Sequence, residues 1–405
     1  MKTKLPRNVW VMTAASFLTD VSSEMVNNLV PLFLANVLGA RTGTIGLVEG
    51  VVESMSSFIK LLSGWWSDRV VSRKPPTVIG YTLSAVSKPL LAFAGSWAAV
   101  LAARFGDRMG KGVRTAPRDA LLADSVPAEG RGAAFGFHRA GDSLGAVVGL
   151  ALALLAVWLT QGNALALDRA TFQRIALFSA VPALLAVLVL ALGLREVRRA
   201  APAVGRPILG SFRAMPPAFR RFLLIFALFT LGNSADAFII LRAQERGLTV
   251  LGVLATLLAF NAVYTVVAGP AGRLSDRIGR PRLILAGWGV YFAIYLGLAL
   301  AGAAWQVLFV AYGAYHGLVE GNARAFVADL AGAEGRGAAY GLYHAVVGLL
   351  ALPASLIGGI LWQGVGGWAG FGPSAPFLFG AILAGAAALL FAVLLPPRQW
   401  QPGAT

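Results

Sequence analysis

The sequence predicts an all-α integral membrane protein with twelve transmembrane helices in two pseudo-symmetric six-helix bundles. The first observation is composition: 57% of the residues are hydrophobic and 13% are charged, whereas soluble domains carry about 25% charged residues. The second is a series of apolar runs that reach the ~20 residues a membrane helix needs. The third is an internal repeat of two charged motifs. Together they exclude an ordinary soluble domain.

The repeat divides the chain into two halves. Gly-x-x-Ser-Asp-Arg occurs at 64–69 and again at 272–277, an offset of 272 − 64 = 208. The run Glu-Gly-Arg-Gly-Ala-Ala at 129–134 returns at 334–339, an offset of 334 − 129 = 205. Two unrelated motifs at nearly one spacing indicate duplication. We therefore expect a first six-helix bundle over 1–197, a cytoplasmic linker over 198–219 and a second bundle over 220–405.

Each half supplies six apolar runs of membrane-spanning length. The first half predicts spans at 8–37, 44–66, 77–94, 98–122, 133–159 and 172–194. Pro31 is expected to kink the first of them, because proline removes a helical hydrogen bond. A basic connector with four prolines follows at 195–221. The second half predicts spans at 222–241, 250–269, 283–300, 305–330, 338–361 and 377–394.

The distribution of Lys and Arg predicts the orientation. With a cytoplasmic N-terminus, twenty of these residues fall in inner loops and tails, and five fall in outer loops. The positive-inside rule then predicts a multi-pass protein of the plasma (inner) membrane with both termini cytoplasmic. Arg41 and Trp368 are expected outside, and Lys74 and Arg206 inside. Membrane topology therefore explains the net charge of +16. We expect the lipid bilayer as a partner and no binding of nucleic acid.

The six-plus-six plan and the charged loops at 64–74 and 272–280 resemble the major facilitator superfamily. Val71 stands where that family usually has Gly, whereas the second copy keeps Gly279. Arg-x-x-x-Gly-x-x-x-Ala at 108–116 resembles the family's fourth-helix pattern, and 19–25 and 110–121 resemble a prokaryotic subgroup of largely unassigned substrate. The resemblance implies that helices 1, 4, 7 and 10 line a central cavity.

The repeated loop motif predicts a cytoplasmic gate. A carboxylate at such a helix end can accept hydrogen bonds from the amides at a neighbouring helix N-terminus. Asp124 and Asp329 occupy equivalent places, since 329 − 124 = 205, and are the expected partners of the motif arginines. The alternative is that these charges only mark topology and cap helices. The gate residues are Gly64, Asp68, Arg69, Asp124, Gly272, Asp276, Arg277 and Asp329.

Charged residues inside the predicted spans are the candidate transport site, because burying each costs several kcal/mol unless it is paired or hydrated. Asp20, Glu24 and Asn27 form one stripe on the first helix, and Asp20 and Glu24 are the expected proton-coupling pair. The alternative is structural ion pairing between packed helices, which we prefer for Lys88 and for the fifth-helix group around Asp142. The cavity and substrate candidates are Asn27, Asn28, Asp107, Arg108, Lys111, Arg114, Asp142, Asn233, Asp236, His316 and Glu320.

The charge balance of the first half bears on the substrate. Six acids face seven bases within its predicted spans. The bases of the fourth helix are therefore matched by acids, and no surplus remains to hold an anion. A neutral or cationic substrate follows from this count. Gly141, Gly145 and Gly149 resemble the family's antiporter-associated motif, although Leu150 stands where that motif has Pro.

These features predict a secondary transporter that works by alternating access. No nucleotide-binding or nucleophile motif is present, so we expect no enzyme activity and no cofactor. Three histidines and no cysteine make a poor metal site. We expect proton-coupled export of a small neutral or cationic solute by a monomer. The alternatives are a proton-coupled symporter for an anionic metabolite, and a membrane receptor or scaffold that does not transport.

Overall fold

The protein is all-helical, as the sequence predicts. The computed structural model describes residues 5–67, 72–126, 131–197, 211–300 and 304–395, and within these ranges it contains no β-strand. The helices of the first half are α1 (Arg7–Asn27), α2 (Val30–Leu32), η1 (Phe33–Val37), α3 (Thr42–Ser67), α4 (Lys74–Leu90), η2 (Leu91–Phe93), α5 (Trp97–Asp124), α6 (Arg131–Gln161) and α7 (Arg169–Gly193).

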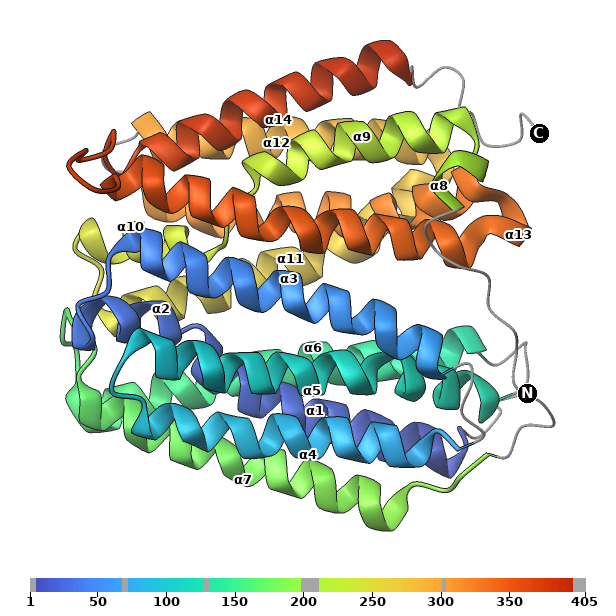
Figure 1. The fold of residues 1–405 in the computed structure, drawn as a ribbon, viewed down its shortest axis with the longest axis horizontal. Coiled ribbons are helices and arrows are strands. Elements are labelled where there is room, and N and C mark those ends of the chain that lie inside the picture. The colour runs from blue at the N-terminus through green and yellow to red at the C-terminus, as the bar shows by residue number, and fades with distance from the viewer. Residues whose placement is uncertain (1–4, 68–71, 127–130, 198–210, 301–303, 396–405) are drawn as a thin grey trace. The chain divides into compact units, whose positions relative to one another are not determined.

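The second half repeats the pattern (Figure 1). Its helices are α8 (Ser211–Ala214), α9 (Pro217–Gly232), α10 (Ala237–Glu245), α11 (Val250–Ile278), α12 (Arg280–Leu300), α13 (Trp305–Gln363) and α14 (Ala375–Leu394). The short α8 and the start of α9 fall within the predicted linker at 198–219, whose first part lies outside the described residues.

Helix α13 contains two predicted spans, 305–330 and 338–361. Tyr312 lies 3.2 Å from Asp236 through its hydroxyl, and the ring of Trp362 lies 6.0 Å from that of Phe238. Asp236 and Phe238 are neighbours, yet Tyr312 and Trp362 are fifty residues apart, which is ~75 Å along a straight helix. The helix must therefore double back between them.

The first helix of each half is interrupted at an equivalent residue. Helix α1 ends at Asn27, because Pro31 has no N–H to donate to the Asn27 carbonyl. The predicted Pro31 kink thus takes the form of a break one turn earlier. In the second half α9 ends at Gly232, and Asn233 has non-helical backbone angles (φ −92°, ψ 78°). Asn28 and Asn233 are separated by 233 − 28 = 205, which is the offset of the repeat.

The chain forms two compact units. Unit 1 comprises residues 1–40, 55–206 and 249–254, and unit 2 comprises 41–54, 207–248 and 255–405. In unit 1, α1 packs against α6 and α7, and α4 packs against α5 and α7. In unit 2, α12 packs against α13 and α14, and α13 and α14 also pack against α9. The boundaries predicted at 197 and 220 stay a prediction.

The cores of the two units differ in chemistry. Aliphatic side chains such as Val9, Met12 and Leu121 fill one core of unit 1. Unit 2 is built around buried aromatic rings: Phe229 stacks on Trp288 at 4.8 Å between centroids, and Tyr291 stacks on Tyr295 at 3.9 Å.

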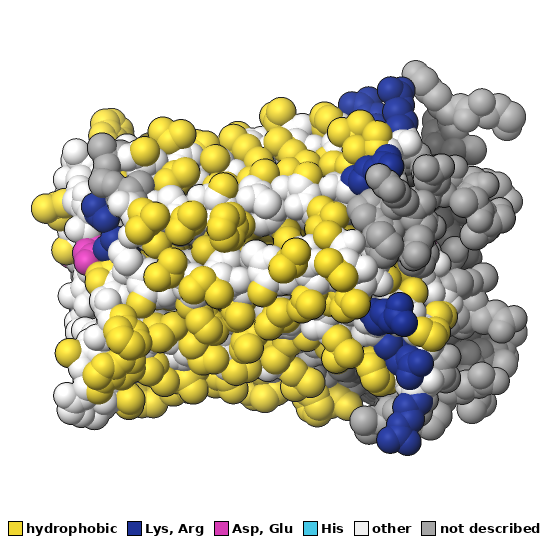
Figure 2. All heavy atoms as spheres, turned by 90° about the horizontal axis from the view of Figure 1, so that it is seen from above, with side chains coloured by type: hydrophobic (Ala, Val, Ile, Leu, Met, Phe, Trp, Pro, Cys, Tyr) yellow, Lys and Arg dark blue, Asp and Glu magenta, His cyan; other side chains and the backbone are white. Residues whose placement is uncertain are grey.

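The outer surface fits a lipid environment. Figure 2 shows a face covered by apolar side chains, with most of the Lys and Arg side chains at one edge and a smaller group at the opposite edge. Seven helical stretches among the described residues are long and apolar enough to cross a membrane. None of the seven precedes Phe137, and the earlier helices α1, α4 and α5 carry the charges discussed next.

Candidate functional site

A second helix packs closely against the acids of α1. A Cβ added at Gly145 of α6 would lie 3.1 Å from the Asp20 Cβ, and one added at Gly149 would lie 3.0 Å from the Glu24 Cβ. Both acids are half-buried. Asn28 donates its Nδ2 hydrogen to Glu24 Oε2 at 2.9 Å, so the residue at the helix break holds the acid one turn before it.

Two of the predicted bases of α5 lie near Asp20. The charged groups that act most strongly on Asp20 are Asp142 of α6 and then Lys111 and Arg114 of α5, followed by Glu24. The structure therefore places Lys111 and Arg114 of α5 near the acid pair. Asn27 is half-buried in the same stripe of α1.

Arg114 is buried with hydrogen-bonding capacity left over. Its guanidinium lies over the ring of Tyr81, 4.2 Å from the centroid, and its residue is 4% exposed. Its Nε and Nη1 atoms have no hydrogen-bond partner among the described residues. The arginine is held in place by cation–π stacking, while two donors stay available.

Asp107 belongs to a buried polar cluster between α4 and α5. It accepts a hydrogen bond from the Ser84 hydroxyl, and the cations acting most strongly on it are Lys88 and Arg108. The Lys88 Nζ also donates to the Thr19 carbonyl of α1 at 3.4 Å. Lys88 and Asp107 are both more than nine-tenths buried. This geometry fits the structural ion pairing that we expected for Lys88. It gives the same role to Asp107, which we had predicted to line the cavity.

Asp142 of α6 lies one turn from His138 of the same helix. Its Oδ1 atom lies 3.9 Å from Nδ1 of His138, and neither atom has a hydrogen-bond partner among the described residues. Its electrostatic influence on Asp20 nevertheless connects it to the α1 acids. Asp142 thus lies near His138 and is also a neighbour of the candidate proton site.

The candidate residues of unit 2 divide into two groups. Asn233 and Asp236 form the break between α9 and α10, where the Tyr312 hydroxyl donates to Asp236 Oδ1 at 3.2 Å. Glu320 accepts from the Tyr264 hydroxyl at 3.0 Å and forms a 2.5 Å ion pair with Arg324 one turn away.

His316 joins the aromatic cluster of unit 2. Its ring lies 4.8 Å from those of both Tyr312 and Tyr315, between centroids. Tyr312, which the sequence analysis missed, links His316 to Asp236. The sequence carries no signal for this link, because a tyrosine in an apolar run is ordinary in a membrane helix.

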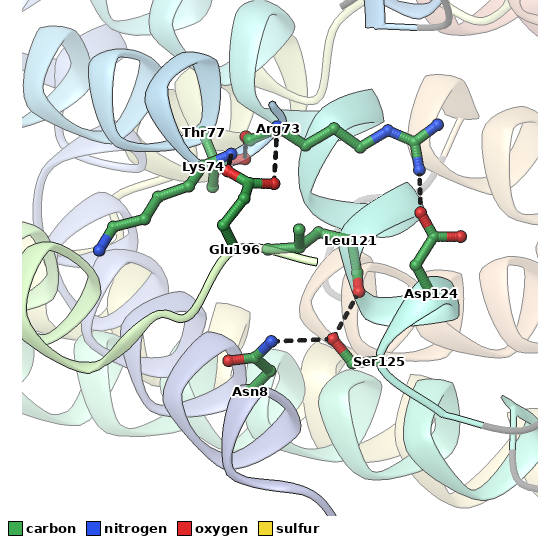
Figure 3. A network of polar contacts seen from close by, with 8 residues as sticks. All are labelled: Asn8, Arg73, Lys74, Thr77, Leu121, Asp124, Ser125 and Glu196. Carbon is green, nitrogen blue, oxygen red and sulfur yellow. Dashed lines mark hydrogen bonds and ion pairs between the residues drawn. The ribbon is translucent and has the colours of Figure 1, made fainter. Parts of the chain in front are cut away.

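A polar network joins the start of α4 to the end of α5 (Figure 3). Arg73 Nη1 forms a 2.5 Å ion pair with Asp124, and Arg73 is 3% exposed through its side chain. The Glu196 carboxylate accepts from the backbone amides of Arg73 and Lys74 at 3.1 and 3.0 Å. Asn8 of α1 joins the same end of unit 1 by donating to Ser125 Oγ at 3.0 Å.

Ion pairs give both gate aspartates an arginine partner, and the partner of Asp329 differs from the predicted one. The predicted partner of Asp124, Arg69, lies outside the described residues. Asp124 pairs with Arg73, and its equivalent Asp329 pairs with Arg280 and not with the expected Arg277, which is exposed. Arg73 and Arg280 lie beyond the Asp-Arg core of each motif, so the arginine that reaches back belongs to the start of the next helix.

Several predicted gate residues cannot be placed in this network. Asp68 and Arg69 lie outside the described residues, and Gly64 and Asp276 are described only as members of their helices. Gly272 accepts a hydrogen bond from the Ser275 hydroxyl at 2.7 Å through its carbonyl. Among the described residues, Glu196 caps the α4 N-terminus, the role expected of an aspartate in the loop motif.

Glu196 makes the network sensitive to acid. Partial burial raises the pKa of Glu196, but hydrogen bonds from Ser72 and from backbone amides outweigh it and hold the pKa below its ordinary value of 4.5. A depressed folded-state pKa stabilises the fold above the unfolded-state pKa, and this stability is lost as pH falls through the folded value.

We therefore expect Glu196→Gln to lower the free energy of unfolding by about 1 kcal/mol at neutral pH. The difference from the unsubstituted protein should shrink as pH falls below about 4.5. Thermal unfolding of detergent-purified protein at a series of pH values measures it. An equal difference at pH 7 and pH 3.5 would contradict the role given to the carboxylate.

Comparison with known proteins gives one consistent result. The Major Facilitator Superfamily profile matches residues 12–355. An uncharacterised MFS-type transporter of Methanocaldococcus jannaschii is 36% identical over 393 residues, covering 94% of this chain and 93% of the relative. An uncharacterised protein of Mycobacterium tuberculosis is 30% identical over 350 residues, covering 84% and 83%.

Solved transporter structures share the fold. The nucleoside transporter NupG superposes with a TM-score of 0.77 at 13% identity, covering 96% of this chain and 99% of its own. The POT family transporter PepTSo gives 0.79 at 14% identity, covering 98% and 99%. A bacterial homologue of the human lysosomal transporter Spinster, inward-facing and unoccupied, gives 0.70 at 17% identity, covering 98% of both chains.

Proposed function

The chain belongs to the Major Facilitator Superfamily, and from this premise we propose that it exports a small neutral or cationic solute in exchange for protons. It is a multi-pass membrane transporter and not an enzyme. The proposal rests on one observation: two half-buried carboxylates, Asp20 and Glu24, lie one turn apart within the first transmembrane helix. Such residues are costly in a membrane and are typical of proton relays.

The surroundings of the pair support a proton-carrying role. Lys111, Arg114 and Asp142 act electrostatically on Asp20, so a proton gained or lost there alters the balance of a shared cluster. Glycine contacts fix the spacing between α1 and α6 at both acids. A change in protonation at the pair is therefore coupled to the packing of two helices.

Lipid vesicles that contain the purified protein and enclose a pH-sensitive dye test this function. Cationic and neutral solutes are added outside the vesicles. In an exchanger, entry of the solute drives protons out and the lumen becomes alkaline. No change in lumenal pH with any solute would overturn the proposal.

Anion–proton symport is the second candidate, and Arg114 favours it. Two donors of this buried guanidinium have no hydrogen-bond partner among the described residues, and arginine is well suited to bind carboxylate or phosphate. The same vesicles distinguish the two functions. An anionic solute that acidifies the lumen as it enters supports symport, and a protein that moves neither solute nor protons is a receptor or scaffold.

We also propose an inner-membrane orientation with cytoplasmic termini, which single cysteines can test because the chain contains none. Trp368→Cys and Arg213→Cys replace residues that are exposed in the structure. In intact cells an impermeant thiol reagent should label position 368 and should label position 213 only after permeabilisation. Labelling at 213 in intact cells would invert the orientation.

A further inference from the structure

The break between α9 and α10 leaves a carboxylate that the local helix does not use. Asp236 precedes α10 as its N-terminal cap residue, yet its side chain makes no capping hydrogen bond. Asp236 is exposed, in a stretch that runs from Pro217 to Glu245 and is long and apolar enough to span a membrane. Helix breaks of this kind line binding sites in transporters, because unpaired backbone is tolerated only beside a cavity or protein.

Buried tyrosines hold this break in a defined geometry. The Tyr312 hydroxyl lies 3.2 Å from Asp236 Oδ1 and 3.5 Å from Asn233 Oδ1, so it can donate to either. The Tyr291 hydroxyl donates to the Gly232 carbonyl at 3.2 Å. Both rings are almost fully buried. Since buried rings have little freedom to rotate, Tyr312 orients the exposed carboxylate without covering it.

The carboxylate lacks a countercharge among the described residues. Among the described residues of unit 2, Glu320 pairs with Arg324, Glu245 with Arg242 and Asp329 with Arg280. Asp236 takes part in no such ion pair. A carboxylate within a membrane span is costly unless it is paired. A bound ligand that carries a positive charge would therefore supply the countercharge that Asp236 lacks.

Aromatic surface indicates what kind of cation fits. The Phe260 ring stacks on Tyr312 at 5.6 Å, the His316 ring meets Tyr312 edge-on at 4.8 Å, and both outer rings are half-buried. Aromatic faces attract ammonium groups by cation–π interaction. The described residues contain no group of three His, Cys, Asp or Glu that could hold a metal ion. An organic cation with an apolar body matches these features better than a metal ion.

We propose that Asp236, positioned by Tyr312, is the anionic contact for an ammonium group on the transported solute. This inference rests on the proposed transport function and narrows its substrate class to organic ammonium compounds. Tyr312 is a positioning residue that acts through Asp236.

Equilibrium binding to the full-length protein in detergent, at one pH and without a gradient, tests the inference. The probes share one skeleton and differ in charge: 2-phenylethylammonium, 2-phenylethanol and phenylacetate, with tetraphenylphosphonium as a bulkier cation. The readout is the ligand-dependent rise in the unfolding temperature, followed by tryptophan fluorescence. The cations should stabilise the protein saturably, and the alcohol and the acid should not.

Four variants separate charge from structure. Asp236→Asn should weaken cation binding about tenfold or more, since it removes a charged contact. Asp236→Glu should keep the preference for ammonium over alcohol with lower affinity. Tyr312→Phe should weaken binding about threefold to tenfold. Tyr343→Phe is the matched control, because Tyr343 is also buried in unit 2 but makes no contact with Asp236.

Three results would overturn the inference: no cation binds saturably, the alcohol or the acid binds as well as the ammonium, or Asp236→Asn binds cations normally. Failure of the proposed exchange function is distinguishable from these. Cation binding that is lost in Asp236→Asn, in a protein whose vesicles show no solute-dependent pH change, would retain the site and reject proton-coupled export.

Discussion

Asp20→Asn is expected to abolish transport driven by a pH gradient in proteoliposomes, and Glu24→Gln is expected to do the same. An amide cannot load and release a proton, so each variant breaks the link between solute movement and the gradient. Solute binding and solute–solute exchange should persist, because neither requires a net proton transfer. Initial rates of uptake with and without an imposed gradient, beside counterflow rates, measure the separation.

The control is Glu245→Gln at the end of α10. Glu245 is paired with Arg242 at 2.7 Å and its side chain is 42% exposed, so losing its charge should leave gradient-driven transport within about twofold of normal. Should both α1 variants respond to the gradient as the unsubstituted protein does, the pair is not the proton site. Loss of binding as well as coupling would instead place the acids in direct contact with solute.

Gly145→Ala is expected to destabilise the protein and to impair transport. The added Cβ would lie 2.5 Å from the Phe17 carbonyl oxygen and 3.1 Å from the Asp20 Cβ. Since backbone atoms cannot rotate away, α1 and α6 must separate. Overpacking of this kind costs about 1–3 kcal/mol. The unfolding temperature of the purified protein and the transport rate both report the effect, and Gly145→Leu should be more severe than Gly145→Ala.

Gly289→Ala is the matched control for this substitution. Gly289 lies within α12, is exposed, and has nothing within 4 Å of an added Cβ. Alanine is favoured over glycine in a helix by up to about 1 kcal/mol, so this variant should be as stable as the unsubstituted protein or more so. If Gly145→Ala matched it, the close packing of α1 on α6 would not matter to stability.

The glycine pattern shows how far a sequence motif leads. Gly141, Gly145 and Gly149 stood out in the sequence by their resemblance to a family motif, and residues four apart lie on the same side of a helix. The motif did not identify the partner. Gly145 and Gly149 abut the residues Asp20 and Glu24, so the motif that permits packing also sets the surroundings of the candidate proton pair.

The gate residues show the limit more clearly. The repeat offset located Asp124 and Asp329 as equivalent residues, and the structure gives both an arginine partner. Their partners are Arg73 and Arg280, which a long flexible side chain and the start of a new helix bring within reach. Glu196 caps α4 from 122 residues further along the chain. Local spacing carries no information about such contacts.

The sequence by itself determined that the protein lies in a membrane, how many spans it has and that its two halves are duplicated. Hydrophobicity, the length of apolar runs and repeated motifs can all be read along the chain without knowledge of tertiary contacts. Tertiary structure alone decided which charges meet. Asp107 is buried beside Ser84 and Lys88. Asp236, at a helix break, is exposed beside Tyr312. Both are acids within predicted or observed spans, and their sequence context does not tell them apart. Their difference arises from the neighbours that helix packing supplies, and those neighbours decide whether an acid is a structural ion partner or a contact for a ligand.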